Sequence, residues 1–176
     1  MSDKNKKTSA SSAQTGLNPK TLFWVGIAIV LVVAAAAVVV WRTTDSPFSL
    51  TKGDVNVMVV LRNTRTAEYT LTYEGKQPVT LERVLPMMQG PTLHTDVNEI
   101  QVQVGDQVYP VDNAGELVAE APVVLGKGDS FQVRITFLGQ SLGANVLYGF
   151  RLGYQEGGQS TTFDLILKDQ YTVFVE

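Results

Sequence analysis

Three side chains able to bind a metal ion lie close together in the segment PMMQGPTLH, residues 86–94. Thioether sulfur and imidazole nitrogen together suit Cu(I), a soft ion, so Met87, Met88 and His94 form a candidate copper site. Met58, or a group outside the segment, would have to supply the remaining ligands. The alternative is that the two methionines fill a gap or contact a partner, and we favour it because adjacent side chains rarely point the same way. In both cases the Pro and Gly residues predict that the segment is a loop.

A second distinctive segment is VLYGFRLGY, residues 146–154, in which large apolar residues occupy every second position. They are expected to share one face of a strand: Tyr148, Phe150, Leu152 and Tyr154. The other face carries Gly149, Arg151 and Gly153, and glycine in a strand often marks the close approach of a ligand or another backbone. These three residues are therefore candidate partner-binding residues. The alternative that we prefer is a core strand with bulges or bends at the glycines.

Other kinds of chemistry find little support in the sequence. The chain has no cysteine, which excludes disulfides, thiolate metal sites, cysteine nucleophiles and a lipoprotein anchor. The segment GKGDS, residues 126–130, lacks the spacing of a phosphate-binding loop and is expected to form a turn. No serine lies in a nucleophile motif. We therefore predict no catalytic residue, no cofactor apart from the copper alternative, and no enzymatic activity.

The longest apolar segment is LFWVGIAIVLVVAAAAVVVW, residues 22–41, which contains no charged residue. A helix of this length spans about 30 Å, the thickness of the hydrocarbon core of a bilayer. Trp24 and Trp41 lie near its two ends, where indole rings favour the headgroup region. We predict a transmembrane helix that is retained as a signal anchor. A cleavable signal peptide is the alternative, but the apolar run is longer than such peptides require.

Small residues along this helix provide a possible contact with a second membrane protein. Gly26, Ala34 and Ala37 would let another helix approach closely, so they are candidate partner-binding residues. The alternative is that they are ordinary apolar residues facing lipid.

The charge distribution predicts the orientation in the membrane. Residues 1–21 carry a net charge of +3 and residues 46–176 a net charge of −6. Lysines close to a transmembrane helix remain on the cytoplasmic side, so we expect a cytoplasmic N-terminus and a periplasmic or extracellular C-terminal domain at the cell (inner) membrane. The polar composition of residues 1–21 predicts a disordered tail. The acidic outer domain is a poor candidate for nucleic-acid binding.

After a short polar linker, residues 42–47, the pattern changes to alternating polar and apolar residues. The clearest alternation places Phe131, Val133, Ile135 and Phe137 on one face. Turns are expected at residues 105–106, 126–129 and 157–158. Extended segments are expected at residues 55–61, 117–125, 161–168 and 171–175, among others. With about eight to ten short strands and no helical period, residues 48–176 are predicted to form an antiparallel, immunoglobulin-like β-sandwich.

These features together indicate a single-pass accessory or structural subunit of a membrane protein complex. It would bind other subunits through its transmembrane helix and its β-sandwich, with the lipid bilayer as its second partner. The alternative is a periplasmic copper chaperone that uses the Met/His segment.

Overall fold

The computed structural model describes residues 46–90 and 92–176. The predicted tail, residues 1–21, the predicted transmembrane helix, residues 22–41, and most of the linker lie outside them. In the part that is described, no helix is long and apolar enough to cross a bilayer.

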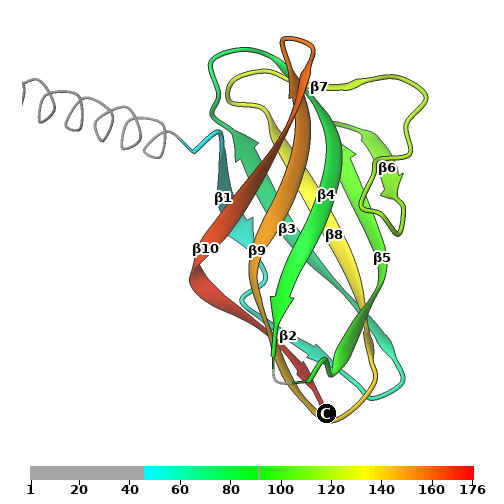
Figure 1. Cartoon of the computed structure of the whole chain (residues 1–176). Coiled ribbons are helices and arrows are strands. Elements are labelled where there is room, and N and C mark those ends of the chain that lie inside the picture. The colour runs from blue at the N-terminus through cyan, green and yellow to red at the C-terminus, as the bar shows by residue number, and fades with distance from the viewer. Residues whose placement is uncertain (1–45, 91) are drawn as a thin grey trace, which may run out of the picture. The chain divides into compact units, whose positions relative to one another are not determined.

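The described chain forms two sheets that face each other, as Figure 1 shows. The first sheet contains, in spatial order, β1 (Phe48–Gly53), β3 (Thr64–Tyr73), β8 (Ser130–Gly139), β5 (Thr95–Val104) and β6 (Gln107–Val111). The second contains β2 (Asn56–Val59), β10 (Gln159–Val175), β9 (Gly143–Glu156), β4 (Val79–Gln89) and β7 (Val123–Leu125). All neighbouring strands are antiparallel except β2 and β10, which are parallel. The predicted β-sandwich is therefore confirmed.

Alternating apolar residues of both sheets form one core between them. On β8 the four residues of the predicted apolar face are all buried. Aromatic rings connect the sheets: the Phe48 ring centroid lies 5.2 Å from that of Tyr73 in the first sheet and 5.4 Å from that of Tyr154 in the second. Tyr69 and Phe150 make a further contact across the core at 5.4 Å. Such tilted and edge-on pairs stabilise a core beyond the burial of their area.

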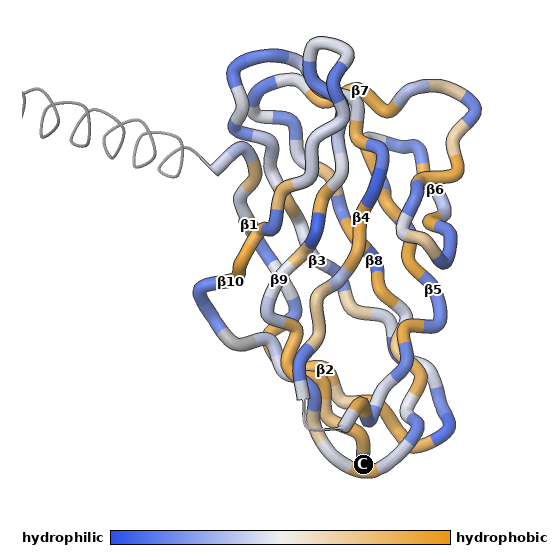
Figure 2. The backbone as a smooth tube through the Cα atoms, in the orientation of Figure 1, coloured by the Kyte–Doolittle hydropathy of each residue, from blue (hydrophilic) through white to orange (hydrophobic). Residues whose placement is uncertain are grey.

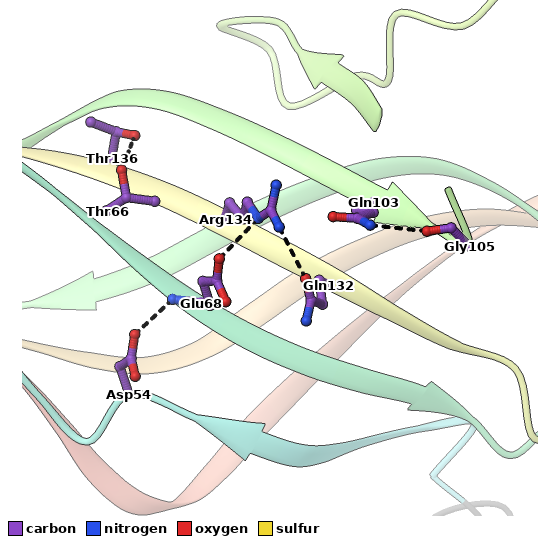
Figure 3. A network of polar contacts seen from close by, with 8 residues as sticks. All are labelled: Asp54, Thr66, Glu68, Gln103, Gly105, Gln132, Arg134 and Thr136. Carbon is purple, nitrogen blue, oxygen red and sulfur yellow. Dashed lines mark hydrogen bonds and ion pairs between the residues drawn. The ribbon is translucent and has the colours of Figure 1, made fainter. Parts of the chain in front are cut away.

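The outer face of the first sheet is polar, as the close view in Figure 3 shows. The hydroxyl oxygens of Thr66 and Thr136, on neighbouring strands, are 2.9 Å apart, and Arg134 Nε donates to Glu68 Oε1 over 3.0 Å. The Glu68 backbone N–H also donates to the carboxylate of Asp54, just after β1. Cross-strand polar pairs of this kind suit a face that remains in water.

The predicted turns at residues 105–106, 126–129 and 157–158 are confirmed, and Gly105, Gly128, Gly157 and Gly158 all have positive φ there. Three predictions are corrected. Residues 86–89 belong to β4 and are not a loop, and only Val123–Leu125 of residues 117–125 is a strand. The two strands expected in residues 161–168 and 171–175 are one strand, β10, with a register shift between Ile166 and Tyr171.

Truncation of a side chain at the centre of β8 should destabilise the protein strongly. Ile135 is fully buried, so Ile135→Ala is expected to lower the free energy of unfolding by about 2–5 kcal/mol through lost burial and a cavity. Urea denaturation followed by far-ultraviolet circular dichroism measures this. Ile166 is 60% exposed, and Ile166→Ala is the matched control with an expected change within about 0.5 kcal/mol. Equal effects of the two substitutions would contradict the assigned core.

Candidate functional site

Met87 and Met88 lie on β4 and point to opposite faces of the second sheet. Met88 pairs with Leu147 and packs against the core. Met87 pairs with Gly149, and its terminal methyl group lies over that glycine, 2.5 Å from where a Cβ atom would be. Side chains alternate between faces along a strand, so the two sulfur atoms cannot bind one ion without a change of backbone.

His94 lies in the segment that crosses from β4 to β5. Its Nδ1 atom is 2.9 Å from the hydroxyl oxygen of Ser141, and its ring packs against Gly143. Among the described residues, no three His, Asp or Glu side chains form a group that could hold a metal ion. The copper site stays a prediction, and the structure does not bring its three residues together on one face.

The contact between His94 and Ser141 has the residue types of a base and a nucleophile. Nucleophilic catalysis also needs a group that orients the base and donors that stabilise the developing charge. In residues 46–90 and 92–176 no carboxylate forms a hydrogen bond with the His94 ring. The pair instead joins two neighbouring turns, since the backbone N–H groups of Gln140 and Ser141 both donate to the His94 carbonyl oxygen.

Asn145 on β9 holds this crossing segment in place. Its side chain is fully buried, and its Oδ1 atom accepts the backbone N–H groups of His94 and Thr95 at 2.7 and 3.1 Å. Its amide nitrogen donates to the carbonyl oxygen of Thr92 at 2.9 Å. Gly90 makes room for this amide, because a Cβ atom there would lie 2.4 Å from Asn145 Nδ2. Every polar atom of the side chain therefore has a partner, as expected for a buried amide.

The glycines of β9 face side chains of the same chain. Met87 covers Gly149, and Arg83 covers Gly153, where a Cβ atom would lie 2.8 Å from the Arg83 Cβ. These contacts favour the core-strand alternative for this segment. Whether the outer face of β9 also binds a partner stays a prediction.

Arg151 lies between the two glycines and pairs with Asp164 directly opposite on β10. Its Nε and Nη2 atoms donate to the two carboxylate oxygens at 2.7 and 2.8 Å. The hydrogen bond from Arg151 lowers the pKa of Asp164, and the carboxylate in turn raises the pKa of Arg151. Both side chains are solvent-exposed, so the pair is expected to contribute little to the stability of the fold.

Tyr148 was expected to share one face of the strand with Phe150. This prediction is wrong, because β9 has a bulge at Tyr148. Gly149 pairs with Met87 and Leu147 with Met88, so Tyr148 has no direct partner on β4. The extra residue shifts the alternation, and the buried side chain is Leu147, while Tyr148 is 37% exposed. The bulge lies one residue before the glycine at which we expected it.

A group of exposed apolar side chains was not singled out in the sequence. Met58, Phe174 and Ala144 lie next to one another across β2, β10 and β9 on the outer face of the second sheet. Val60 and Leu142 lie at the same end of the sandwich. We call Met58, Val60, Leu142 and Phe174 the apolar patch; their side chains are 56, 53, 65 and 42% exposed. Figure 2 shows hydrophobic residues along β2 and beside the C-terminus.

The signal for this patch was present in the sequence. Residues 55–61 are apolar at nearly every position, so both faces of β2 carry hydrophobic side chains. Val57 and Val59 point into the core, whereas Val55, just before the strand, is 51% exposed. The other sequence candidates, Gly26, Ala34 and Ala37, lie outside the described residues.

Removal of the Asn145 side chain should release the crossing segment. Asn145→Ala leaves the N–H groups of His94 and Thr95 buried without an acceptor, so the free energy of unfolding is expected to fall by about 2–3 kcal/mol. Amide hydrogen exchange at residues 92–95 should accelerate at the same time. Asn113 is exposed, and Asn113→Ala is the control with no expected change. Unchanged exchange in Asn145→Ala would contradict the described role.

Comparisons with known proteins give neither a family nor an activity. No family model and no curated protein sequence matches the chain. Among solved structures, the VesB protease of Vibrio cholerae is similar over 77% of this chain, with 15% identity and a TM-score of 0.39, and the chain spans about a third (34%) of that protein. A PapD-like domain of human CEP192 (12% identity, TM-score 0.34) matches 74% of this chain and 84% of its own length. Murine CRIg (10% identity, TM-score 0.31) matches 74% of this chain and 99% of its own length.

Proposed function

We propose that this chain is a non-enzymatic, single-pass membrane subunit that binds other proteins through an immunoglobulin-like β-sandwich. Residues 22–41 provide the anchor, with residues 1–21 in the cytoplasm and the sandwich on the periplasmic or extracellular side. The apolar patch is the observation that carries the proposal. Contiguous apolar groups on a protein surface, such as the paired Met58 and Phe174, often mark an interaction surface.

The contrast between the two sheets supports this assignment of the binding face. The outer face of the first sheet is occupied by threonine pairs and by the ion pair between Arg134 and Glu68. The outer face of the second sheet carries the Arg151–Asp164 ion pair, but at its β2 edge it exposes Met58 on β2 and Phe174 on the neighbouring strand. About half of each side chain is still exposed, so its burial in an interface would stabilise a complex by about 1 kcal/mol per side chain.

The inner strands also favour an immunoglobulin-like arrangement. The orders β3-β8-β5 and β4-β9-β10 correspond to the B-E-D and C-F-G orders of immunoglobulin-like sandwiches. Sandwiches of this class bind partners with sheet faces, edges and end loops, and fold alone assigns no activity to them. The proposed function therefore rests on the patch and on the predicted anchor.

Substitution of the patch should separate the chain from its partner. We expect the tagged full-length protein, solubilised gently from its own membranes, to co-purify with another membrane protein. Met58→Ser with Phe174→Ser should reduce recovery of that protein by about tenfold or more, because the two side chains supply much of the apolar contact. Val108→Ser with Val118→Ser is the control, since these valines are similarly exposed elsewhere. Recovery of the wild-type chain alone, or equal recovery with both double variants, would contradict the proposal.

Copper binding is the alternative function, and the geometry of β4 makes a specific prediction about it. Because Met87 and Met88 point to opposite faces, Met88→Leu should leave any Cu(I) affinity unchanged. Competition with a chromogenic Cu(I) chelator measures this for the wild type, Met87→Leu, Met88→Leu and His94→Ala. A stoichiometric Cu(I) complex that is weakened equally by all three substitutions would contradict the described strand and favour the chaperone.

A further inference from the structure

β10 has a long free edge. On one side it pairs with β9 from Gln159 to Val175, but on the other side β2 pairs only with Thr172–Val175. Within the described residues, no backbone hydrogen bond joins residues 159–166 to any strand or turn besides β9. Figure 1 shows that β10 bends at the level of its register shift, so the half paired with β2 and the free half run in different directions.

The backbone groups on this edge can be assigned from the turn that precedes it. Gly157 and Gly158 form a two-residue turn, so Glu156 and Gln159 are the hydrogen-bonded pair that closes the hairpin. Hydrogen-bonded pairs then recur at every second residue. The N–H and C=O groups of the intervening residues point to the free edge: Ser160, Thr162, Asp164 and Ile166. Beyond the bend, even-numbered residues still direct their backbone groups away from β9. The Thr172 N–H, for example, donates to the carbonyl oxygen of Val55 on the β2 side.

A groove runs beside this edge. It has a volume of ≈ 440 Å³ and lies between β10 and β1, which is the edge strand of the first sheet. Its apolar lining comes from both sheets: Phe48, Leu50, Phe163, Leu165 and Leu167. An added strand with apolar residues at alternate positions would therefore extend the second sheet and place those side chains between the sheets.

The other edges of the sandwich are protected against strand addition. β6 contains Pro110, β7 has three residues and β2 has four, and β1 has a register shift between Leu50 and Lys52. Natural sheets commonly protect exposed edges with prolines, bulges, short strands and lysines. Residues 159–166 of β10 contain no proline, no lysine and no bulge, and the charged residues Lys168 and Asp169, which also line the groove, follow only at the bend. This edge is therefore the one suited to pairing.

Charges at one end of the groove indicate what the added strand carries. Glu156 lies opposite Gln159 at the start of β10, and Glu74 lies next to β1, where its carboxylate is 3.5 Å from the Ser49 hydroxyl. The Glu74 N–H donates to the carbonyl oxygen of Pro47, and the neighbouring Phe48 ring lies 5.4 Å from that of Tyr154, two residues before Glu156, so both carboxylates lie near one end of the groove. A lysine or arginine of the added strand would complement them.

We propose that the groove between β1 and β10 binds an extended segment of a partner protein, which adds to the free edge of β10 as a strand. The segment has apolar residues at alternate positions and a basic residue at the end near Glu74 and Glu156. This inference deepens the proposed binding function by naming the kind of segment that is bound, and it uses a surface distinct from the apolar patch.

A substitution at Thr162 tests the backbone pairing. The probe is a fluorescent peptide of about ten residues that alternates valine with threonine and has lysine at both ends. Its affinity for the full chain in detergent micelles is measured by fluorescence anisotropy. Thr162→Pro removes one edge N–H without loss of a bond to β9 and should weaken binding by about tenfold. Thr162→Val, which keeps the N–H, should bind like the wild type.

A second pair of variants keeps the test decisive if Thr162→Pro does not fold. Glu74→Lys with Glu156→Lys changes two exposed residues, and it should weaken binding of the lysine-ended peptide and strengthen binding of a peptide with glutamate at both ends. No saturable binding to the wild type, or equal binding by Thr162→Pro with a native circular dichroism spectrum, overturns the proposal. A dimer of the chain that Thr162→Pro dissociates also overturns it, because the occupant is then a second copy.

The Met58→Ser and Phe174→Ser variant distinguishes this inference from the proposed function. It should bind the peptide normally, since Phe174 lies on the half of β10 that pairs with β2, and Met58 is its partner on β2. Loss of the partner protein with unchanged peptide binding shows two separate surfaces. If the patch variant still binds the partner protein, and Thr162→Pro no longer binds the peptide, the groove alone is the binding surface.

Discussion

The arrangement of the second sheet depends on a break in register that crosses three neighbouring strands at one level. It falls between Met87 and Met88 on β4, at Tyr148 on β9, and between Ile166 and Tyr171 on β10. A bulge bends its strand and increases the local twist. Here the bend lets the end of β10 pair with β2, while its first half stays unpaired beside β1. The free edge and the groove both follow from this break.

The two sheets differ in their outer faces. In the first sheet β3, β8 and β5 are joined by long ladders, with one register shift between Val97 and Glu99, and are covered outside by paired polar side chains. The second sheet is irregular, and its outer face and edge expose apolar groups. Apolar side chains on the outer face and a free edge in the same sheet suit the binding function proposed above.

The alternation of polar and apolar residues in the sequence predicted most of this fold. The predictions that were wrong each have an identifiable physical cause. The apolar face of β8 and the glycine turns follow from local rules of side-chain parity and backbone conformation. The bulge at Tyr148 does not, because its position depends on how β9 pairs with β4, which are far apart in the sequence. That Met87 and Met88 point apart follows from the local alternation of side chains, because residues 86–89 are part of β4 and not the predicted loop.

The candidate surfaces were harder to predict than the fold. The glycines of β9 attracted attention as possible contact points, but Met87 and Arg83 occupy the space above them. The apolar patch needed the parallel pairing of β2 with β10 to bring Met58 beside Phe174. The free edge is visible only once both neighbours of β10 are known. The cover over the glycines, the apolar patch and the free edge all depend on which distant strands pair. The pattern of a single sequence does not contain this information.

The aromatic contacts near the bend have a spectroscopic consequence. Both tryptophans lie in residues 22–41, so residues 46–176 emit ultraviolet fluorescence through tyrosine alone. The Tyr171 ring lines the groove just past the bend, and its centroid lies 5.9 Å from that of Tyr69. Burial raises the pKa of Tyr69, so its phenol stays protonated in ordinary buffers. In a chain with Trp24 and Trp41 replaced by phenylalanine, tyrosine emission becomes an intrinsic optical reporter of whether the groove is filled.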